Sequence, residues 1–247
     1  MTRTRLLVLG AVAGATLLVW TASSELPPAA RAWTTALLVL LPPLMVLQAS
    51  MLPRLDELPP RSSLYLSSAI SLWFLAGATV AVVLASGIPV ADIGLRTAPL
   101  AATLAWTGGI IAGGLLLMKA AHTFGLRESP LLWGLLPRTR REKVQFVGVS
   151  LTAGICEELI FRGFLITQLH RATGTLLLAV ILSAGAFGVL HAYQRPAGAA
   201  RAAALGVLLA LPFLYTASLL PSMLAHAGID IIAGLWLRDL LASGHDD

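Results

Sequence analysis

The sequence predicts an all-α membrane protein, a polytopic helical bundle with about eight transmembrane helices. Hydrophobic residues make up 57% of the 247 residues and charged residues only 12%, against roughly 25% charged residues in soluble domains. Apolar runs of about 20 residues, the length that crosses a bilayer as a helix, recur along the whole chain. Composition and run length together place this chain in a lipid bilayer.

Eight candidate spans follow one another along the chain. The first has Arg3 and Arg5 ahead of its apolar core, as a signal peptide has, but the many further spans favour a retained anchor. Pro42 and Pro43 interrupt the second span and predict a kink. Residues 131–136 are too few to cross and predict an interfacial segment. The spans lie near 6–22, 33–52, 64–86, 100–119, 144–168, 175–191, 199–220 and 222–241.

The basic residues predict the orientation of the bundle. With eight spans and the N-terminus in the cytoplasm, thirteen of the seventeen Lys and Arg residues fall on the cytoplasmic side. Arg31, Arg96 and Arg171 fall outside, and Arg162 lies within a span. Both termini are therefore expected in the cytoplasm. The net charge of +5 comes from these short loops, so we expect the lipid bilayer as a partner and no nucleic acid. Arg outnumbers Lys by fifteen to two, which indicates a GC-rich bacterial genome and hence the inner membrane.

Ionisable residues inside the spans are concentrated in the second half of the chain. Each ionised side chain at mid-bilayer costs about 2.5 to 3.5 kcal/mol, so a cluster of them predicts a function. We expect one compact membrane domain with N-terminal scaffold spans in residues 1–130 and a catalytic transmembrane core in residues 131–247. The later spans carry Glu157, Glu158, Arg162, His191, His226 and Asp230.

Helical spacing separates the two neighbouring glutamates. Glu158 and Arg162 are four residues apart and can pair on one helix face, whereas Glu157 is rotated by about 100° and can point elsewhere. A Glu–Arg pair that only fixes helix packing accounts for Glu158 but leaves Glu157 unexplained. His226 and Asp230 also share a face, so the aspartate could orient the imidazole, or the pair could be a polar contact between helices.

One Glu and two His facing a common cavity are compatible with two mechanisms of hydrolysis. In the first, Glu157, His191 and His226 bind zinc, which leaves one coordination position for an activated water. The second needs no metal, because a buried glutamate takes a proton from water with the help of a histidine while other donors stabilise the oxyanion. The residues alone leave open whether the cofactor is zinc or absent.

Three short segments, in this order on late spans, resemble the CAAX protease and bacteriocin-processing family (CPBP, also called Abi), which includes the type II CAAX prenyl endopeptidases. They are Glu-Glu-x-x-x-Arg starting at Glu157, Phe-x-x-x-His ending at His191, and His-x-x-x-Asp starting at His226. The resemblance covers roughly residues 144–241. It implies an all-helical intramembrane endopeptidase, and the eukaryotic members of the family remove the last three residues of prenylated proteins.

The resemblance also implies roles for the first two segments. Glu157 would activate the water together with His191. Glu158 would pair with Arg162 to hold the helix. Phe187 is expected to pack near the cavity without a chemical role.

In the third segment, the resemblance implies that His226 and Asp230 stabilise the oxyanion. The position of Asp230 is often Asn in the prenyl-processing members of the family. An ionised aspartate cannot donate a hydrogen bond to an oxyanion, so Asp230 must be protonated or must orient His226 instead.

We therefore expect a CAAX-type hydrolase, a metalloprotease if the zinc alternative holds, that cleaves a membrane-embedded or lipidated protein or peptide. The alternative is a non-catalytic membrane protein, such as a scaffold, an immunity factor or a proton-coupled carrier that uses Glu157, His191 and Asp230 as a proton relay. A relay needs titratable groups across the membrane, whereas hydrolysis needs groups that converge on one water. The first four spans carry no acids, which favours the enzyme.

Overall fold

The computed structural model describes residues 3–50, 58–126 and 129–236, and all regular elements within these ranges are helical. This confirms the predicted all-α class. The elements are α1 (Arg3–Ala22), α2 (Pro28–Thr35), η1 (Ala36–Leu40), α3 (Leu41–Ser50), α4 (Arg61–Ala85), α5 (Leu100–Thr123), α6 (Pro130–Leu135), α7 (Arg140–Glu157), η3 (Glu158–Ile166), α8 (Thr167–Thr173), α9 (Leu176–Leu190), η4 (Ala192–Gln194), α10 (Arg195–Thr216) and α11 (Leu220–Leu235).

Five helical stretches of the described residues are long and apolar enough to cross a membrane. They are Pro28–Ser50, Arg61–Ala85, Leu100–Thr123, Arg140–Thr173 and Ala192–Thr216. Shorter apolar helices at Ala11–Ala22, Leu176–Leu190 and Leu220–Leu235 occupy the positions of the remaining predicted spans. An all-helical structure with several candidate membrane spans is thus confirmed. The count of eight stays a prediction. The predicted span ends at residues 52 and 241 lie outside the described residues.

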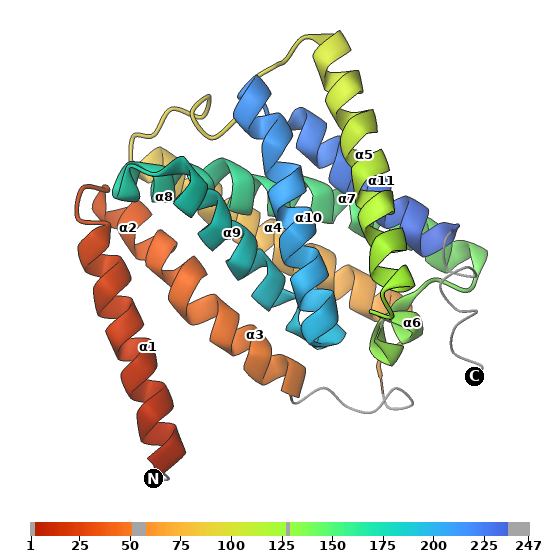
Figure 1. The fold of residues 1–247 in the computed structure, drawn as a ribbon, viewed down its shortest axis with the longest axis horizontal. Coiled ribbons are helices and arrows are strands. Elements are labelled where there is room, and N and C mark those ends of the chain that lie inside the picture. The colour runs from red at the N-terminus through yellow and green to blue at the C-terminus, as the bar shows by residue number, and fades with distance from the viewer. Residues whose placement is uncertain (1–2, 51–57, 127–128, 237–247) are drawn as a thin grey trace.

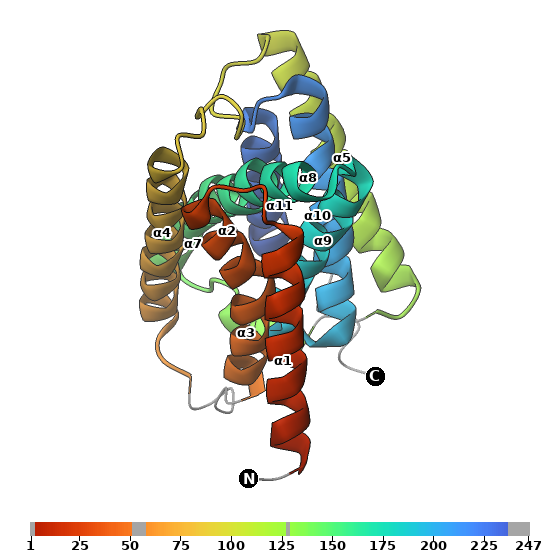
Figure 2. The ribbon, with the colours of Figure 1, turned by 90° about the vertical axis from the view of Figure 1, so that its left-hand side faces the viewer.

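One long helical segment crosses the whole molecule. Figure 1 shows α1, α2 and α3 at one side of the fold and α5 and α11 at the other. The segment α7–η3–α8 runs between these sides, and Figure 2 shows it lying across the steeper helices α1, α4 and α10. Along its course α7 packs against α4 and α11, and η3 packs against α9. This segment therefore connects helices from both halves of the chain.

A capping box fixes the start of α7. The Thr139 hydroxyl accepts a hydrogen bond from the Glu142 backbone N–H, and the Glu142 carboxylate accepts one from the Thr139 backbone N–H at 2.9 Å. Two N–H groups that a helix start would leave unpaired are thereby satisfied. Because the cap sets where α7 begins, it also sets the position of the residues at its end.

Close backbone packing joins α7 to α11. A Cβ atom at Gly154 would lie 2.7 Å from the carbonyl oxygen of Met223 and 3.0 Å from the Cβ of Ala227. The two helices can approach this closely only because residue 154 has no side chain. The contact places Glu157, at the end of α7, beside the helix that carries His226.

Two segments adopt the wider π-helical geometry. The first, η1, directly precedes Pro42 and Pro43, and the Leu41 N–H donates to the Ala36 carbonyl five residues earlier. Prolines have no N–H to donate and crowd the preceding turn, and a wider turn relieves both effects. The second span therefore accommodates the two prolines through a π-helical turn and continues as a helix beyond them.

The second π-helical segment, η3, forms the centre of the fold. All nine of its residues are buried. The hydroxyl of Ser183 on α9 donates to the carbonyl oxygen of Phe161 at 2.8 Å and supplies a partner from a neighbouring helix. π-Helical turns occur often at functional sites, and η3 begins at Glu158.

Candidate active site

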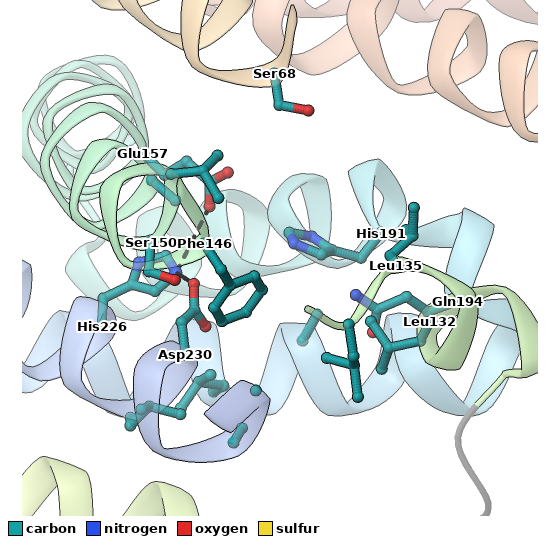
Figure 3. Close-up of a pocket in the computed structure, with 18 of the residues that line it drawn as sticks. Ser68, Leu132, Leu135, Phe146, Ser150, Glu157, His191, Gln194, His226 and Asp230 are labelled. Carbon is teal, nitrogen blue, oxygen red and sulfur yellow. Dashed lines mark ion pairs between the residues drawn. The ribbon is translucent and has the colours of Figure 1, made fainter. Parts of the chain in front are cut away.

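A cavity of about 350 Å³ lies among α4, α5, α6, α7, α10 and α11. Its wall is mostly apolar, but Glu157, His191, His226 and Asp230 all line it. Figure 3 shows Glu157, His226 and Asp230 gathered at one end, and His191 projecting into the same cavity from the other side. The structure thus brings all four predicted catalytic residues to one place.

The predicted pair of Glu158 and Arg162 is present and buried. Arg162 Nη1 lies 2.8 Å from Glu158 Oε1, and the two side chains are 1% and 0% exposed. The guanidinium also donates to the carbonyl of Gly206 at 3.3 Å and lies 4.4 Å from the ring centre of Phe187. A buried ion pair with such additional partners is costly to break, because removal of one member leaves an uncompensated charge.

Glu158 has a second partner that the sequence analysis did not predict. His226 Nδ1 lies 2.8 Å from Glu158 Oε1, the same oxygen that pairs with Arg162. An ionised carboxylate only accepts hydrogen bonds, so we assign the proton to Nδ1. The other ring nitrogen of His226, Nε2, then faces the cavity.

Two carboxylates surround that second nitrogen. Glu157 Oε2 and Asp230 Oδ2 each lie 3.7 Å from His226 Nε2, as the dashed lines of Figure 3 mark. Asp230 therefore lies on the side of Nε2, whereas Glu158 holds Nδ1. The side chain of Asp230 is 36% exposed, so a ligand in the cavity can reach it.

His191 directly follows α9 and is held by that helix. Its Nδ1 lies 2.8 Å from the carbonyl oxygen of Phe187, and an N–H at Nδ1 leaves the lone pair on Nε2. The Phe187 ring is 4.6 Å from the His191 ring and 6.0 Å from the His226 ring. Phe187 therefore packs between the two imidazoles and beneath the guanidinium of Arg162, close to the cavity.

The donor set for the zinc alternative is not assembled. In the described part of the chain no three His, Cys, Asp or Glu side chains are grouped so that they could hold a metal ion. Glu157, His191 and His226 line one cavity without forming such a group, so these residues do not fit a preformed zinc site.

Several polar residues of the cavity wall belong to no predicted motif. Tyr65 and Ser68 come from α4, and Ser150 comes from α7. Tyr193 and Gln194 lie two and three residues after His191. Polar residues so close to a motif histidine were a signal in the sequence. Tyr65 and Ser68 lie in the polar first half of α4, far from the motifs in sequence, and offered no such signal. The cavity wall therefore includes helices that we assigned to the scaffold.

Residues 140–232 match the family described as Rce1-like, type II CAAX prenyl endopeptidase Rce1-like. The chain carries an Rce1-like domain. This domain begins with the first residue of α7, ends within α11 and contains all three motifs, which confirms the resemblance to the CAAX protease family. An Rce1-like domain indicates CAAX-type endopeptidase activity, and with the apolar helices it indicates an integral membrane protein that acts on membrane-associated substrates. No curated protein and no solved structure matches the chain.

Proposed function

We propose that the protein is an intramembrane endopeptidase that hydrolyses a peptide bond of a membrane-embedded or lipidated protein, with a water activated by Glu157 and His191. The observation that carries the proposal is the 3.7 Å approach of Glu157 to His226 in a cavity that His191 and Asp230 also line. The Rce1-like domain supports the same reaction class.

The first step is attack by water. Glu157 takes a proton from the water, and the water oxygen forms a bond to the carbonyl carbon of the scissile peptide. His191 assists from the other side of the cavity, because the Phe187 carbonyl holds its Nδ1 and leaves Nε2 to accept a hydrogen bond from the same water. The product of this step is a tetrahedral intermediate with an oxyanion.

His226 and Asp230 stabilise that oxyanion. When His226 carries both ring protons, Nε2–H donates to the oxyanion while Nδ1–H stays on Glu158. Asp230 donates a second hydrogen bond in its carboxylic acid form. The intermediate then collapses, the C–N bond breaks, and the proton held by Glu157 passes to the leaving nitrogen. The products are a carboxylic acid and an amine.

A proton relay fits the arrangement less well. A relay needs titratable groups spread across the membrane, whereas Glu157, His226 and Asp230 gather at one end of one cavity. The described helices α1 to α5 contain no Asp or Glu that could extend such a chain. Convergence of the acids therefore supports hydrolysis.

The test compares new peptide termini in membranes that contain the wild-type chain, Glu157→Gln or Glu25→Gln. Glu157→Gln keeps the shape of the side chain and removes the base, so we expect the termini to fall by at least about 100-fold. Glu25 is exposed and far from the motifs in sequence, so Glu25→Gln is the matched control and should behave as wild type. Equal termini with wild type and Glu157→Gln, at equal folded yield, would refute the proposal.

A further inference from the structure

One hydroxyl of the cavity wall is buried beside the predicted site and belongs to none of the three motifs. Ser150 on α7 is 2% exposed and lines the cavity. Other buried hydroxyls of the bundle, such as those of Thr103 and Ser222, donate to backbone carbonyl oxygens. Within the part of the chain that the structure describes, the Ser150 hydroxyl makes no hydrogen bond. Its proton is therefore available to a molecule bound in the cavity.

Ser150 shares one face of α7 with Glu157. The two residues are seven apart, which is close to two full turns of an α-helix, and both line the cavity. Two turns correspond to about 10 Å along the helix axis. Ala153 lies between them on the same face and also lines the cavity, and its side chain is only a methyl group. The space between Glu157 and Ser150 is thus open to a water and a substrate carbonyl group.

The packing of α7 against α11 shows which residues face each other across the interface. Gly154 lies against Ala227, because a Cβ atom at Gly154 would be 3.0 Å from the Cβ of Ala227. Farther along, a Cβ atom at Gly234 would meet the ring of Phe146. Residue numbers fall along α7 as they rise along α11, so the two helices are antiparallel. Residues midway between these two contacts therefore lie opposite each other.

Ser150 and Asp230 occupy these middle positions, which places the hydroxyl at the level of the carboxyl group. Figure 3 shows Ser150 at the end of the cavity where His226 and Asp230 gather, and His226 Nε2 lies 3.7 Å from Asp230 Oδ2. An ionised aspartate can only accept hydrogen bonds. The Ser150 hydroxyl is a donor at this end of the cavity whatever the protonation state of Asp230.

We infer that Ser150 is a further catalytic residue, whose hydroxyl donates a hydrogen bond to the oxyanion that forms when water attacks the scissile carbonyl. This inference rests on the proposed function. A hydroxyl rotates to suit its acceptor, and a donor aimed at a developing charge is most effective in a site with apolar walls. The hydroxyl proton stays on Ser150 Oγ throughout, since Glu157 takes the proton of the attacking water.

The experiment uses the purified full-length chain in lipid nanodiscs. The substrate is a quenched-fluorescence decapeptide that spans a cleavage site identified from the new peptide termini. Ser150→Ala removes the hydroxyl and keeps the helix, so we expect kcat to fall by about 100-fold. KM should stay within about twofold, because loss of an interaction made only in the transition state lowers kcat alone. Ser150→Cys keeps a weak donor of similar shape and should recover part of the rate.

A binding measurement separates the transition state from the bound substrate. The probe is the same decapeptide with a phosphinate in place of the scissile peptide group, since its charged oxygens occupy the position of the oxyanion. Ser150→Ala should weaken the Kd of this probe by about the same factor as kcat/KM. The Kd of the uncleaved decapeptide, measured in Glu157→Gln with and without Ser150→Ala, should stay unchanged.

Ser67→Ala is the matched control, since Ser67 lies on α4, is exposed and does not line the cavity. It should behave as wild type in both measurements. The thermal midpoint of each variant is recorded as a check of the fold.

Equal kcat values for wild type and Ser150→Ala would overturn the inference and leave the proposed function intact. A raised KM at unchanged kcat would also overturn it, because that result indicates contact with the bound substrate only. A lower kcat with a lower thermal midpoint and equally weakened binding of both ligands would indicate a structural role and overturn it as well. Absence of cleavage by wild type would refute the proposed function and the inference with it.

Discussion

Replacement of Arg162 by leucine tests whether the buried pair holds the fold. The substitution leaves the carboxylate of Glu158 at 0% exposure without its guanidinium partner, and breaking a buried pair in this way costs about 3 to 5 kcal/mol. The hydrogen bond to Gly206 and the contact with the Phe187 ring are lost as well. His226 still lies 2.8 Å from the same carboxylate oxygen and can offset part of the charge, so we expect about 3 kcal/mol.

A surface pair with closely similar geometry provides the control. Arg171 Nη2 lies 2.7 Å from Asp92 Oδ2, but these side chains are 39% and 42% exposed. Exposed pairs contribute about 0 to 1 kcal/mol because water and salt screen them. Arg171→Leu should therefore change stability by no more than about 1 kcal/mol. Because the two pairs have nearly the same distance, the difference in stability between the two Arg→Leu variants measures the effect of burial.

The assay is reversible denaturation of each purified variant in the same detergent, with folded yield and thermal midpoint recorded in parallel. For a chain of this size about 3 kcal/mol corresponds to a fall of roughly 6 to 12 °C in the midpoint. The double variant Glu158→Leu with Arg162→Leu should be less destabilised than Arg162→Leu alone, because it contains no buried unpaired charge at this site. An Arg162→Leu variant as stable as Arg171→Leu would show that the pair is not buried and would refute the reasoning.

Two further predictions concern helix packing and metal. Gly154→Ala should lower stability by about 1 to 3 kcal/mol and reduce activity, because the added Cβ would lie 2.7 Å from the Met223 carbonyl oxygen. Gly148→Ala on the same helix is the control, since a Cβ there would have no neighbour within 4 Å. It should be neutral or slightly stabilising in the same denaturation assay. Treatment with a strong zinc chelator should leave peptide cleavage unchanged, because no three metal ligands are grouped in the described residues. If chelation removed the activity and added zinc restored it, the metal-free activation of water by Glu157 and His191 would be contradicted.

Local patterns in the sequence predicted the features that depend on a single helix. The length of the apolar runs predicted where most helices lie, because a helix in a bilayer must satisfy its backbone internally. The spacing of Glu158 and Arg162 predicted their pair, since residues four apart share a helix face. The structure contains that pair at 2.8 Å. The three motifs also contain Glu157, Glu158 and Asp230, the carboxylates that lie within 4 Å of a ring nitrogen of His226.

Partnerships between helices could not be predicted in the same way. Glu158 and His226 are 68 residues apart. Spacing within one helix does not show which face of that helix contacts which face of another helix in the bundle. Helical spacing suggested that Asp230 orients His226, yet the closer partner at 2.8 Å is Glu158, and Asp230 lies 3.7 Å from the other nitrogen. The contribution of α4 to the cavity wall was hidden for the same reason, since Tyr65 and Ser68 belong to none of the three motifs and lie far from them in sequence.

The shared oxygen of Glu158 couples the stability of the fold to the geometry of the site. Arg162 and His226 both contact Glu158 Oε1, so any change that frees this carboxylate alters the orientation of His226 as well as the charge balance of the core. Loss of activity in Arg162→Leu is therefore expected even in the fraction of protein that stays folded.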